Sequence, residues 1–386
     1  MHIAIDYTPA IRQRAGIGRY TRGLVRALSE LDRANRYTLF CAGQPAGEAA
    51  SAPTRGLGSE DGWPANFAFK VSNLPARWLT AGWHKLKLPL HAERLAGESD
   101  IFHSPDFTLP PLRSAAGIVT IHDLSFLRLP DCADPGLRDY LSKSVPDSVA
   151  RARRVLADSE NTRQDLIELL DVPADKISVV PPGVGPTFRP VRDTVLLNNV
   201  RERYRLPQWF ILFVGTIEPR KNLARLISAY GQLRRQTGLP HALVLAGGQG
   251  WLSQGIYDQV AREGLSEHVL FPGFIADDDL PALYTLADLF AFPSLYEGFG
   301  IPPLEAMACG TPVVASNNSS LPEATGAAAL LVDAEDVDGL ADAMARVLGD
   351  AVLRARLSDL GRAQAARFTW RGAAETLLRA YEATAG

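Results

Sequence analysis

The chain has 386 residues, of which 46% are hydrophobic and 22% charged, and its net charge is -3. This composition is typical of folded globular proteins and excludes a disordered or fibrous chain, and the length favours two domains over one hydrophobic core. No apolar run is long enough to span a membrane, and the N-terminal residues are typical of a strand and not of a signal peptide, so we expect neither a membrane span nor a signal peptide. We also expect no nucleic-acid partner.

The cysteines and the charge distribution bear on the location of the protein and on what it could bind. Cys41, Cys132 and Cys309 are too few and too scattered for a disulfide framework, so we expect a reducing, cytoplasmic location. Residues 1–94 carry an excess of Lys and Arg over Asp and Glu. This excess could attract anionic lipid headgroups or a phosphorylated substrate, although solvated helix faces are the simpler explanation.

In the first half of the chain, short apolar runs alternate with helical segments, a pattern typical of parallel α/β proteins. Helices are predicted at 17–31 and 134–152. Strands are predicted at 2–6, 37–42, 67–71, 101–104, 118–123, 155–159 and 177–181.

A Pro- and Gly-rich stretch ends at Pro190, and the alternation then starts again. Strands are predicted at 209–216, 242–247, 268–274, 289–294, 311–316 and 328–333. We therefore predict an α/β protein with two Rossmann-like doubly wound domains facing a central cleft, over 1–189 and 190–369, with a last helix at 370–386 packing back on the first. Such sheets bind ligands at the carboxyl ends of their strands.

A glycine-containing loop follows the first strand. Gly16 directly precedes the helix predicted at 17–31 and Gly18 lies in its first turn, where backbone N–H groups can approach an anion closely. A dinucleotide-binding GxGxxG motif would need glycine at position 21, which is Thr21, so an NAD site is not expected. A purely structural tight turn remains the alternative.

Two further loops suit phosphate binding. Arg220 and Lys221 follow the strand at 209–216, and this pair suits a diphosphate, although a solvated surface pair is equally simple. The segment LYEGFGIPPLEAMACGTPVV places Glu297 and Glu305 on either side of a glycine-rich turn and a helix start. Ionised carboxylates accept hydrogen bonds from sugar hydroxyls, but Glu305 could also simply favour the helix dipole.

Several motifs together resemble one family. The two glutamates match an EX7E motif, and GTIEPRKN, the Gly16/Gly18 loop, IHDLSF, ADSENTR and the PPGV linker occur in matching order along nearly the whole chain. The chain thus resembles a retaining glycosyltransferase of family four with the GT-B fold. It departs from the family pattern at Pro181 and Pro182, where relatives often carry Asn before Gly-Val.

The resemblance implies roles for individual residues. Arg220 and Lys221 would bind the donor diphosphate and stabilise its departing charge, and Glu297 would contact the donor sugar. The turn at Gly298, Phe299 and Gly300 would bind the sugar and the phosphates, and Glu305 would bind the ribose. The base would lie near Phe274 and Ile275. His122 would lie beside the anomeric carbon, and Gly16 and Gly18 would contact the donor.

The implied chemistry is transfer of a hexose with retention, by a same-face substitution in which the leaving phosphate accepts the acceptor's proton. We expect no cofactor and metal independence, with the run Asp277–Asp279 read as a helix start. A mannosyltransferase using GDP-mannose in surface polysaccharide assembly is favoured. A non-catalytic nucleotide-sugar-binding protein and a GT-B epimerase or phosphorylase remain alternatives.

The acceptor is expected to be a saccharide or a lipid-linked saccharide. Trp78, Trp83, Lys85 and Lys87 mix aromatic and basic character in the half that would bind it. Interfacial helices have this composition, so peripheral contact with the inner membrane face is one hypothesis. A core-packing helix with a solvated basic face is the other.

Overall fold

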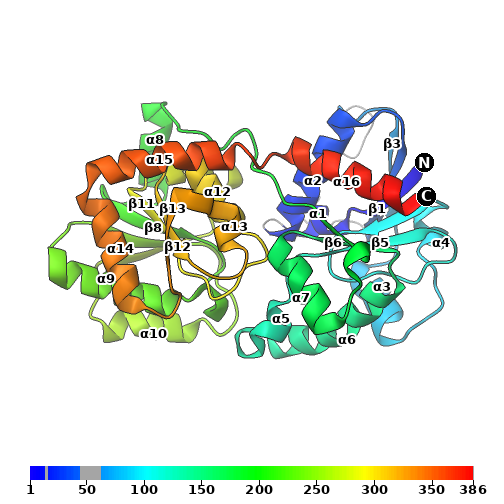
Figure 1. The fold of residues 1–386 in the computed structure, drawn as a ribbon, viewed down its shortest axis with the longest axis horizontal. Coiled ribbons are helices and arrows are strands. Elements are labelled where there is room, and N and C mark those ends of the chain that lie inside the picture. The colour runs from blue at the N-terminus through cyan, green and yellow to red at the C-terminus, as the bar shows by residue number, and fades with distance from the viewer. Residues whose placement is uncertain (14–15, 44–61, 386) are drawn as a thin grey trace. The chain divides into compact units, whose positions relative to one another are not determined.

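The computed structural model describes residues 1–13, 16–43 and 62–385 (Figure 1). These residues form two compact units, each built on one parallel sheet. The first unit comprises Met1–Leu124, Asp139–Gly183 and Trp370–Gly386, and the second comprises Ser125–Arg138 and Val184–Thr369.

The first unit contains a seven-stranded sheet in the order β3-β2-β1-β4-β5-β6-β7. Its strands are β1 (His2–Asp6), β2 (Arg36–Ala42), β3 (Phe67–Ser72), β4 (Ile101–Ser104), β5 (Ala116–Ile121), β6 (Arg154–Ala157) and β7 (Ile177–Val179). The helical segments that accompany it are α1 (Thr8–Arg12), α2 (Ile17–Leu31), α3 (Ala76–Thr80), the π-helical η2 (Ala81–Lys85), α4 (Glu93–Ala96), α6 (Pro135–Arg151), α7 (Glu160–Leu170), the 3-10 turn η4 (Ala174–Lys176) and α16 (Trp370–Ala385). Strands β1, β2, β4, β5 and β6 are largely buried on both faces, which is why they read as continuous apolar runs, whereas the edge strand β3 is partly exposed.

The second unit contains a six-stranded sheet in the order β10-β9-β8-β11-β12-β13. Its strands are β8 (Phe210–Val214), β9 (Ala242–Ala246), β10 (Val269–Gly273), β11 (Leu289–Phe292), β12 (Val313–Ser316) and β13 (Ala329–Val332). Its α-helices are α5 (Ser125–Arg128), α8 (Thr194–Arg203), α9 (Leu223–Thr237), α10 (Gln254–Arg262), α11 (Leu280–Leu286), α12 (Ile301–Ala308), α13 (Leu321–Thr325), α14 (Val337–Gly349) and α15 (Ala351–Ala365). Four 3-10 turns complete it: η3 (Pro130–Cys132), η5 (Pro219–Lys221), η6 (Asp277–Asp279) and η7 (Gly326–Ala328).

The units divide the chain differently from the expected ranges 1–189 and 190–369. Val184 donates a backbone hydrogen bond to Phe368 and pairs with Thr369, so the residues after Gly183 belong to the second unit. The segment Ser125–Arg138, which includes the first turn of α6, also belongs to that unit, and its Cys132 carbonyl accepts from the indole of Trp251 over 2.7 Å.

Helix α16 belongs to the first unit, and Figure 1 shows it in red beside α2. Its apolar face joins the core formed by α2 and the sheet. The hydroxyl of Tyr381 is hydrogen bonded to Nδ1 of His103 over 2.8 Å, and Nε2 of the same ring meets Thr120 over 2.9 Å. The last helix is therefore tied to β4 and β5 by polar contacts as well as by packing.

The tryptophan-containing segment after Pro75 does not form one amphipathic helix. Helix α3 gives way to the π-helical η2, and Lys87 then adopts a φ of 49° ahead of Pro89, which offers no N–H to continue a helix. Trp83 is buried, with 8% of its surface exposed, whereas Trp78 is 65% exposed. The two tryptophans thus have different roles.

Among the described residues, no helix is long and apolar enough to cross a membrane. The same residues include no group of three or more His, Cys, Asp or Glu side chains suited to a metal ion. In the acidic run, Asp279 accepts hydrogen bonds from Arg203 over 2.6 Å and from Tyr204 over 2.7 Å, immediately before α11.

Candidate active site

Two cationic side chains stand where the chain leaves β8. The turn η5 carries Arg220 and Lys221 ahead of α9. Asn222 closes the turn in the left-handed conformation, with φ 60°. Its side-chain amide donates to the carbonyls of Pro293 and Ala334. The turn is therefore fixed to the loop that follows β11.

Both cations meet Glu297, which follows β11. Nζ of Lys221 donates to Oε1 of Glu297 over 2.6 Å, and Arg220 donates to Oε2 over 3.1 Å. Arg220 also donates to the Glu218 carboxylate and to the Tyr296 carbonyl, each over 2.8 Å. The predicted residues Arg220, Lys221 and Glu297 thus form one cluster beyond the carboxyl ends of β8 and β11, the neighbouring strands at which the strand order reverses.

The cluster balances its own charges. Burial alone would raise the pKa of Glu297, but Lys221 and Arg220 outweigh burial and lower that pKa to about 2. Burial and the neighbouring Arg220 lower the pKa of Lys221, against the opposing attraction of Glu297 and Glu218. A carboxylate with so low a pKa holds a proton weakly, which makes Glu297 a poor general base.

The loop that carries Glu297 is held by two serines just before α13. Oγ of Ser319 accepts from the backbone N–H of Glu297 over 3.0 Å. The buried hydroxyl of Ser320 lies 2.9 Å from the carbonyl of Glu297 and 2.8 Å from that of Phe299. Neither serine was predicted from the sequence, because they act through contacts more than twenty residues away along the chain.

The glycine turn before α12 is buried at Gly298, Phe299 and Gly300. Gly300 has φ 114°, and a Cβ there would lie 2.9 Å from Cδ2 of Leu321, so glycine is required for both conformation and space. Within the described part of the chain, the N–H groups of Phe299 and Gly300 donate to no protein acceptor. Such groups at a helix start are suited to an anion.

The other predicted donor residues in this unit lie outside the Arg220 cluster. Glu305 is buried on α12, and its Oε2 accepts from the hydroxyl of Tyr284 over 3.1 Å. Phe274 is 48% exposed, whereas the side chain of Ile275 is buried in the core. Contacts of these residues with a ribose or a base stay predictions.

The two glycines of the first unit that were predicted to contact the donor differ in the space that a side chain would have. Gly16 precedes α2 with φ 55°, and a Cβ there would meet nothing within 4 Å. A Cβ at Gly18 would lie 1.8 Å from the carbonyl oxygen of Gln13. Close packing therefore explains Gly18, whereas Gly16 leaves open space at the helix start.

His122 lies directly after β5 and is held at both ring nitrogens. Nε2 lies 2.8 Å from the Pro105 carbonyl, and Nδ1 lies 2.8 Å from Oδ2 of Asp158, which follows β6. Because a carbonyl only accepts, Nε2 carries a proton. Burial opposes the charged ring, but Asp158 and Asp106 raise the pKa of His122 to about 9. His122 is therefore an imidazolium at neutral pH, a partnership with Asp158 that the sequence did not predict.

Comparison with known proteins assigns this chain to a family. Residues 14–188 match the family model described as Glycosyltransferase Family 4, and residues 199–364 match that of Glycosyl transferases group 1. The O-antigen chain mannosyltransferase B of Escherichia coli is 32% identical over 388 residues, which cover 99% of this chain and 100% of that protein. The chain belongs to glycosyltransferase family four. The family predicted from the motifs is confirmed, and with it a glycosyltransferase activity.

In two further relatives, the matched region covers a smaller share of the relative's own length. The serotype-specific mannosyltransferase WbdA of Escherichia coli is 35% identical over 251 residues, which are 64% of this chain and 31% of that protein. A D-inositol 3-phosphate glycosyltransferase of Salinispora arenicola is 32% identical over 76% of this chain and 71% of its own.

Solved structures confirm the predicted fold class. Sucrose-phosphate synthase from Thermosynechococcus elongatus superposes with a TM-score of 0.74 at 22% identity, over 99% of this chain and 98% of its own. Anabaena HepE in complex with UDP and glucose gives a TM-score of 0.73 at 18% identity, over 99% of both chains. These likenesses concern the fold, which is the GT-B arrangement of two Rossmann-like units.

Proposed function

We propose that this glycosyltransferase transfers mannose from GDP-mannose, with retention of the anomeric configuration, to a saccharide or lipid-linked saccharide of a surface polysaccharide. The observation that carries the proposal is the Lys221–Glu297–Arg220 cluster beside the start of α12. The choice of mannose is supported by the full-length likeness to a protein named as an O-antigen chain mannosyltransferase.

The cluster is suited to a departing diphosphate. The ammonium group of Lys221 has three N–H donors, and in the described residues one of them is directed to Glu297. The N–H groups of Phe299 and Gly300 would add backbone donors at the positive end of the α12 dipole. Such fixed donors stabilise charge that develops on the leaving group without reorganisation during the reaction.

The proton of the acceptor hydroxyl needs a base. Glu297 is unsuited because its pKa is lowered to about 2, and a phosphate monoester has a second pKa of about 6. We therefore assign this role to the leaving β-phosphate. The C1–O bond to that phosphate breaks, the acceptor oxygen bonds C1 on the same face, and its proton passes to the released GDP. Glu297 would orient Lys221 and Arg220 and accept from a donor hydroxyl.

The test combines donor binding with product analysis. Thermal-shift measurements with GDP, UDP and ADP should show the largest stabilisation for GDP, and GDP-mannose should be converted with a mannose-terminated disaccharide into an α-linked trisaccharide. Larger stabilisation by UDP or ADP would overturn the donor assignment. A β-linked product would overturn retention, and binding of GDP-mannose without transfer would favour a nucleotide-sugar-binding protein.

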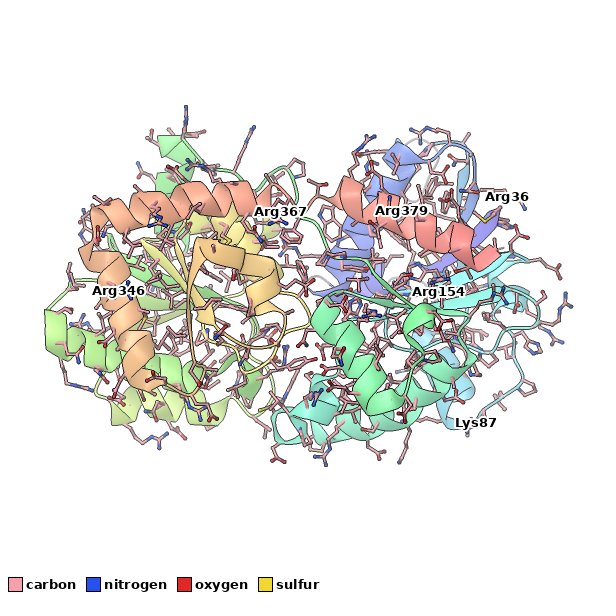
Figure 2. All side chains as sticks on the ribbon, in the orientation of Figure 1. Arg36, Lys87, Arg154, Arg346, Arg367 and Arg379 are labelled. Atoms are coloured by element: carbon pink, nitrogen blue, oxygen red, sulfur yellow. The ribbon has the colours of Figure 1, made fainter. Side chains whose placement is uncertain are left out.

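We also propose peripheral membrane contact by the 70–88 surface. It comprises exposed apolar and basic side chains around α3 and η2, namely Val71, Leu74, Trp78, Leu86, Leu88, Lys70, Arg77, Lys85 and Lys87. No Asp or Glu occurs from Gly62 to Ala92. Lys87, labelled in Figure 2, is exposed on this segment. Exposed apolar groups interleaved with cations are suited to an anionic lipid surface.

A further inference from the structure

The segment Ser125–Arg138 belongs to the second unit, although the chain on either side of it belongs to the first. The first unit ends at Leu124 and starts again at Asp139, so both ends of the segment continue directly into the first unit. The segment comprises α5, η3 and the first turn of α6, and it begins shortly after His122. One stretch of chain therefore leads from the end of β5 into the second unit.

A tryptophan of the second unit holds this segment. The indole N–H of Trp251 donates to the carbonyl of Cys132, the last residue of η3, over 2.7 Å. Trp251 is partly buried and follows β9 after a glycine-rich turn at residues 247–250. An indole has one N–H donor and no acceptor, so this bond uses the full hydrogen-bonding capacity of the ring. The contact therefore depends on a donor at this position and not on an aromatic ring alone.

The turn that carries Trp251 is joined to the loop that carries Arg220. The backbone N–H of Ile217 donates to the carbonyl of Gly248 over 3.0 Å, and the N–H of Gly250 donates back to the carbonyl of Ile217 over 3.1 Å. A Cβ at Gly250 would lie 3.0 Å from the same carbonyl oxygen, so glycine allows the two backbones to approach closely. A displacement of the turn would therefore also displace the loop.

The segment also lies close to the charged cluster. Burial raises the pKa of the Cys132 thiol, and the Arg220 charge opposes this effect. Asp131 and Glu218 raise the same pKa further. Because such charge effects weaken with distance, the thiol lies near the pair that Glu218 forms with Arg220 over 2.8 Å. The carboxylate that orients Arg220 is thus next to the segment that Trp251 holds.

We infer that Trp251 is a positioning residue for the diphosphate site, because its hydrogen bond to Cys132 keeps the segment Ser125–Arg138 against the loop of Arg220. The inference rests on the proposed transferase function and adds a residue that acts through its neighbours, without contact with the donor. Groups that stabilise a transition state must be held in place by the residues around them. Without this bond, Arg220 would meet the leaving phosphate in the productive geometry less often.

The test is a steady-state comparison of wild type with Trp251→Phe, which keeps an aromatic ring and removes the N–H. Loss of one neutral hydrogen bond should lower kcat/KM for GDP-mannose about two- to tenfold. The KM for an α-linked mannose disaccharide as acceptor should not change. Trp209→Phe, the same replacement at an exposed tryptophan of the second unit, is the matched control and should leave both constants unchanged. An effect on stability alone would lower Tm without separating the donor constant from the acceptor constant.

The thiol of Cys132 gives a second measurement that does not depend on transfer. Cys41 and Cys309 are buried and Cys132 is half-buried, so the reagent DTNB should react first with Cys132, and Cys132→Ser should remove this phase. Trp251→Phe should accelerate the reaction at least twofold because the segment is released, and Trp209→Phe should not. An unchanged thiol rate or an unchanged kcat/KM for GDP-mannose in Trp251→Phe would overturn the inference. If wild type transfers nothing from GDP-mannose, the proposed function fails separately, and the thiol rates then decide.

Discussion

Lys221 donates a hydrogen bond from Nζ to Oε1 of Glu297 over 2.6 Å, within a cluster in which Arg220 contacts the other oxygen of the same carboxylate. The side chains of Lys221 and Glu297 are 11% and 10% exposed. Because both side chains are largely buried, each charge is needed to compensate the other. We therefore expect substitutions here to affect stability as well as catalysis.

Glu297→Ala should reduce transfer by about a hundredfold or more, because the two cations lose the group that orients them. It should also reduce the free energy of unfolding by up to about 3 kcal/mol, since removal of one partner leaves buried charge uncompensated. GDP should still bind, because Arg220 and Lys221 remain. Transfer rates, Tm and GDP titration measure the three effects.

Glu335→Ala is the control for this prediction, because that carboxylate is 76% exposed and meets Arg225 over 3.5 Å. It should alter neither rate nor Tm. The double variant Lys221→Met with Glu297→Gln should recover Tm relative to Glu297→Ala but not activity. Near-normal turnover in Glu297→Ala would contradict the assigned site.

Gly300→Ala should destabilise the second unit by about 1 to 3 kcal/mol and reduce transfer, because the methyl group meets Leu321 and the φ of 114° disfavours any side chain. Gly255→Ala is the matched control, since its Cβ would meet nothing within 4 Å in α10. That change should be neutral or stabilise by up to about 1 kcal/mol. Equal Tm values for the two variants would show that the turn before α12 tolerates a side chain.

The strands and longer helices could be predicted because their signal is local. Strand β8 is a continuous apolar run, and α2 has one face of buried residues, so both were located from sequence. The candidate site residues Arg220, Lys221 and Glu297 were predicted from motifs, but their mutual contacts join positions 76 or 77 residues apart. Sequence spacing carries no information about such contacts.

Of the features missed from the sequence, the partnership of His122 with Asp158 has the same non-local origin, whereas two others had a local signal. Glu218 stands inside the quoted GTIEPRKN motif, and its partner Arg220 could have been suspected from charge alone. The Asp158 partner of His122 lies on another strand end, 36 residues away. The break in the helix predicted after Pro75 had a local signal, Pro89, which the aromatic and basic composition obscured.

The stability of the first unit should fall at alkaline pH through His122. Its pKa is raised to about 9 in the folded protein, above the usual value of 6.5. The stabilisation is therefore complete below about pH 6.5 and is lost as the pH rises through 9, by at most about 3 kcal/mol. The difference in Tm between wild type and His122→Gln should shrink from pH 7 to pH 9.5.

Asn73→Gln, at an exposed residue of the same unit whose side chain does not titrate, is the control, and its Tm difference from wild type should stay constant over that range. Asp158→Asn should remove the pH dependence in the same way as His122→Gln, because it removes the charge that holds the imidazolium. A constant difference for both variants would mean that His122 is neutral in the folded protein.

The 70–88 surface should bind vesicles that contain phosphatidylglycerol and release them as salt rises. A lysine or arginine near an anionic surface contributes about 1 kcal/mol, so Lys85→Gln with Lys87→Gln should weaken partitioning about 30-fold. Trp78→Ser should weaken it as well, because its side chain is 65% exposed and available for burial among lipids. Trp209→Ser, which removes a 47% exposed tryptophan of the second unit, should leave flotation unchanged. Flotation of wild type that is absent at low salt, or equal for all variants, would contradict membrane contact by this surface.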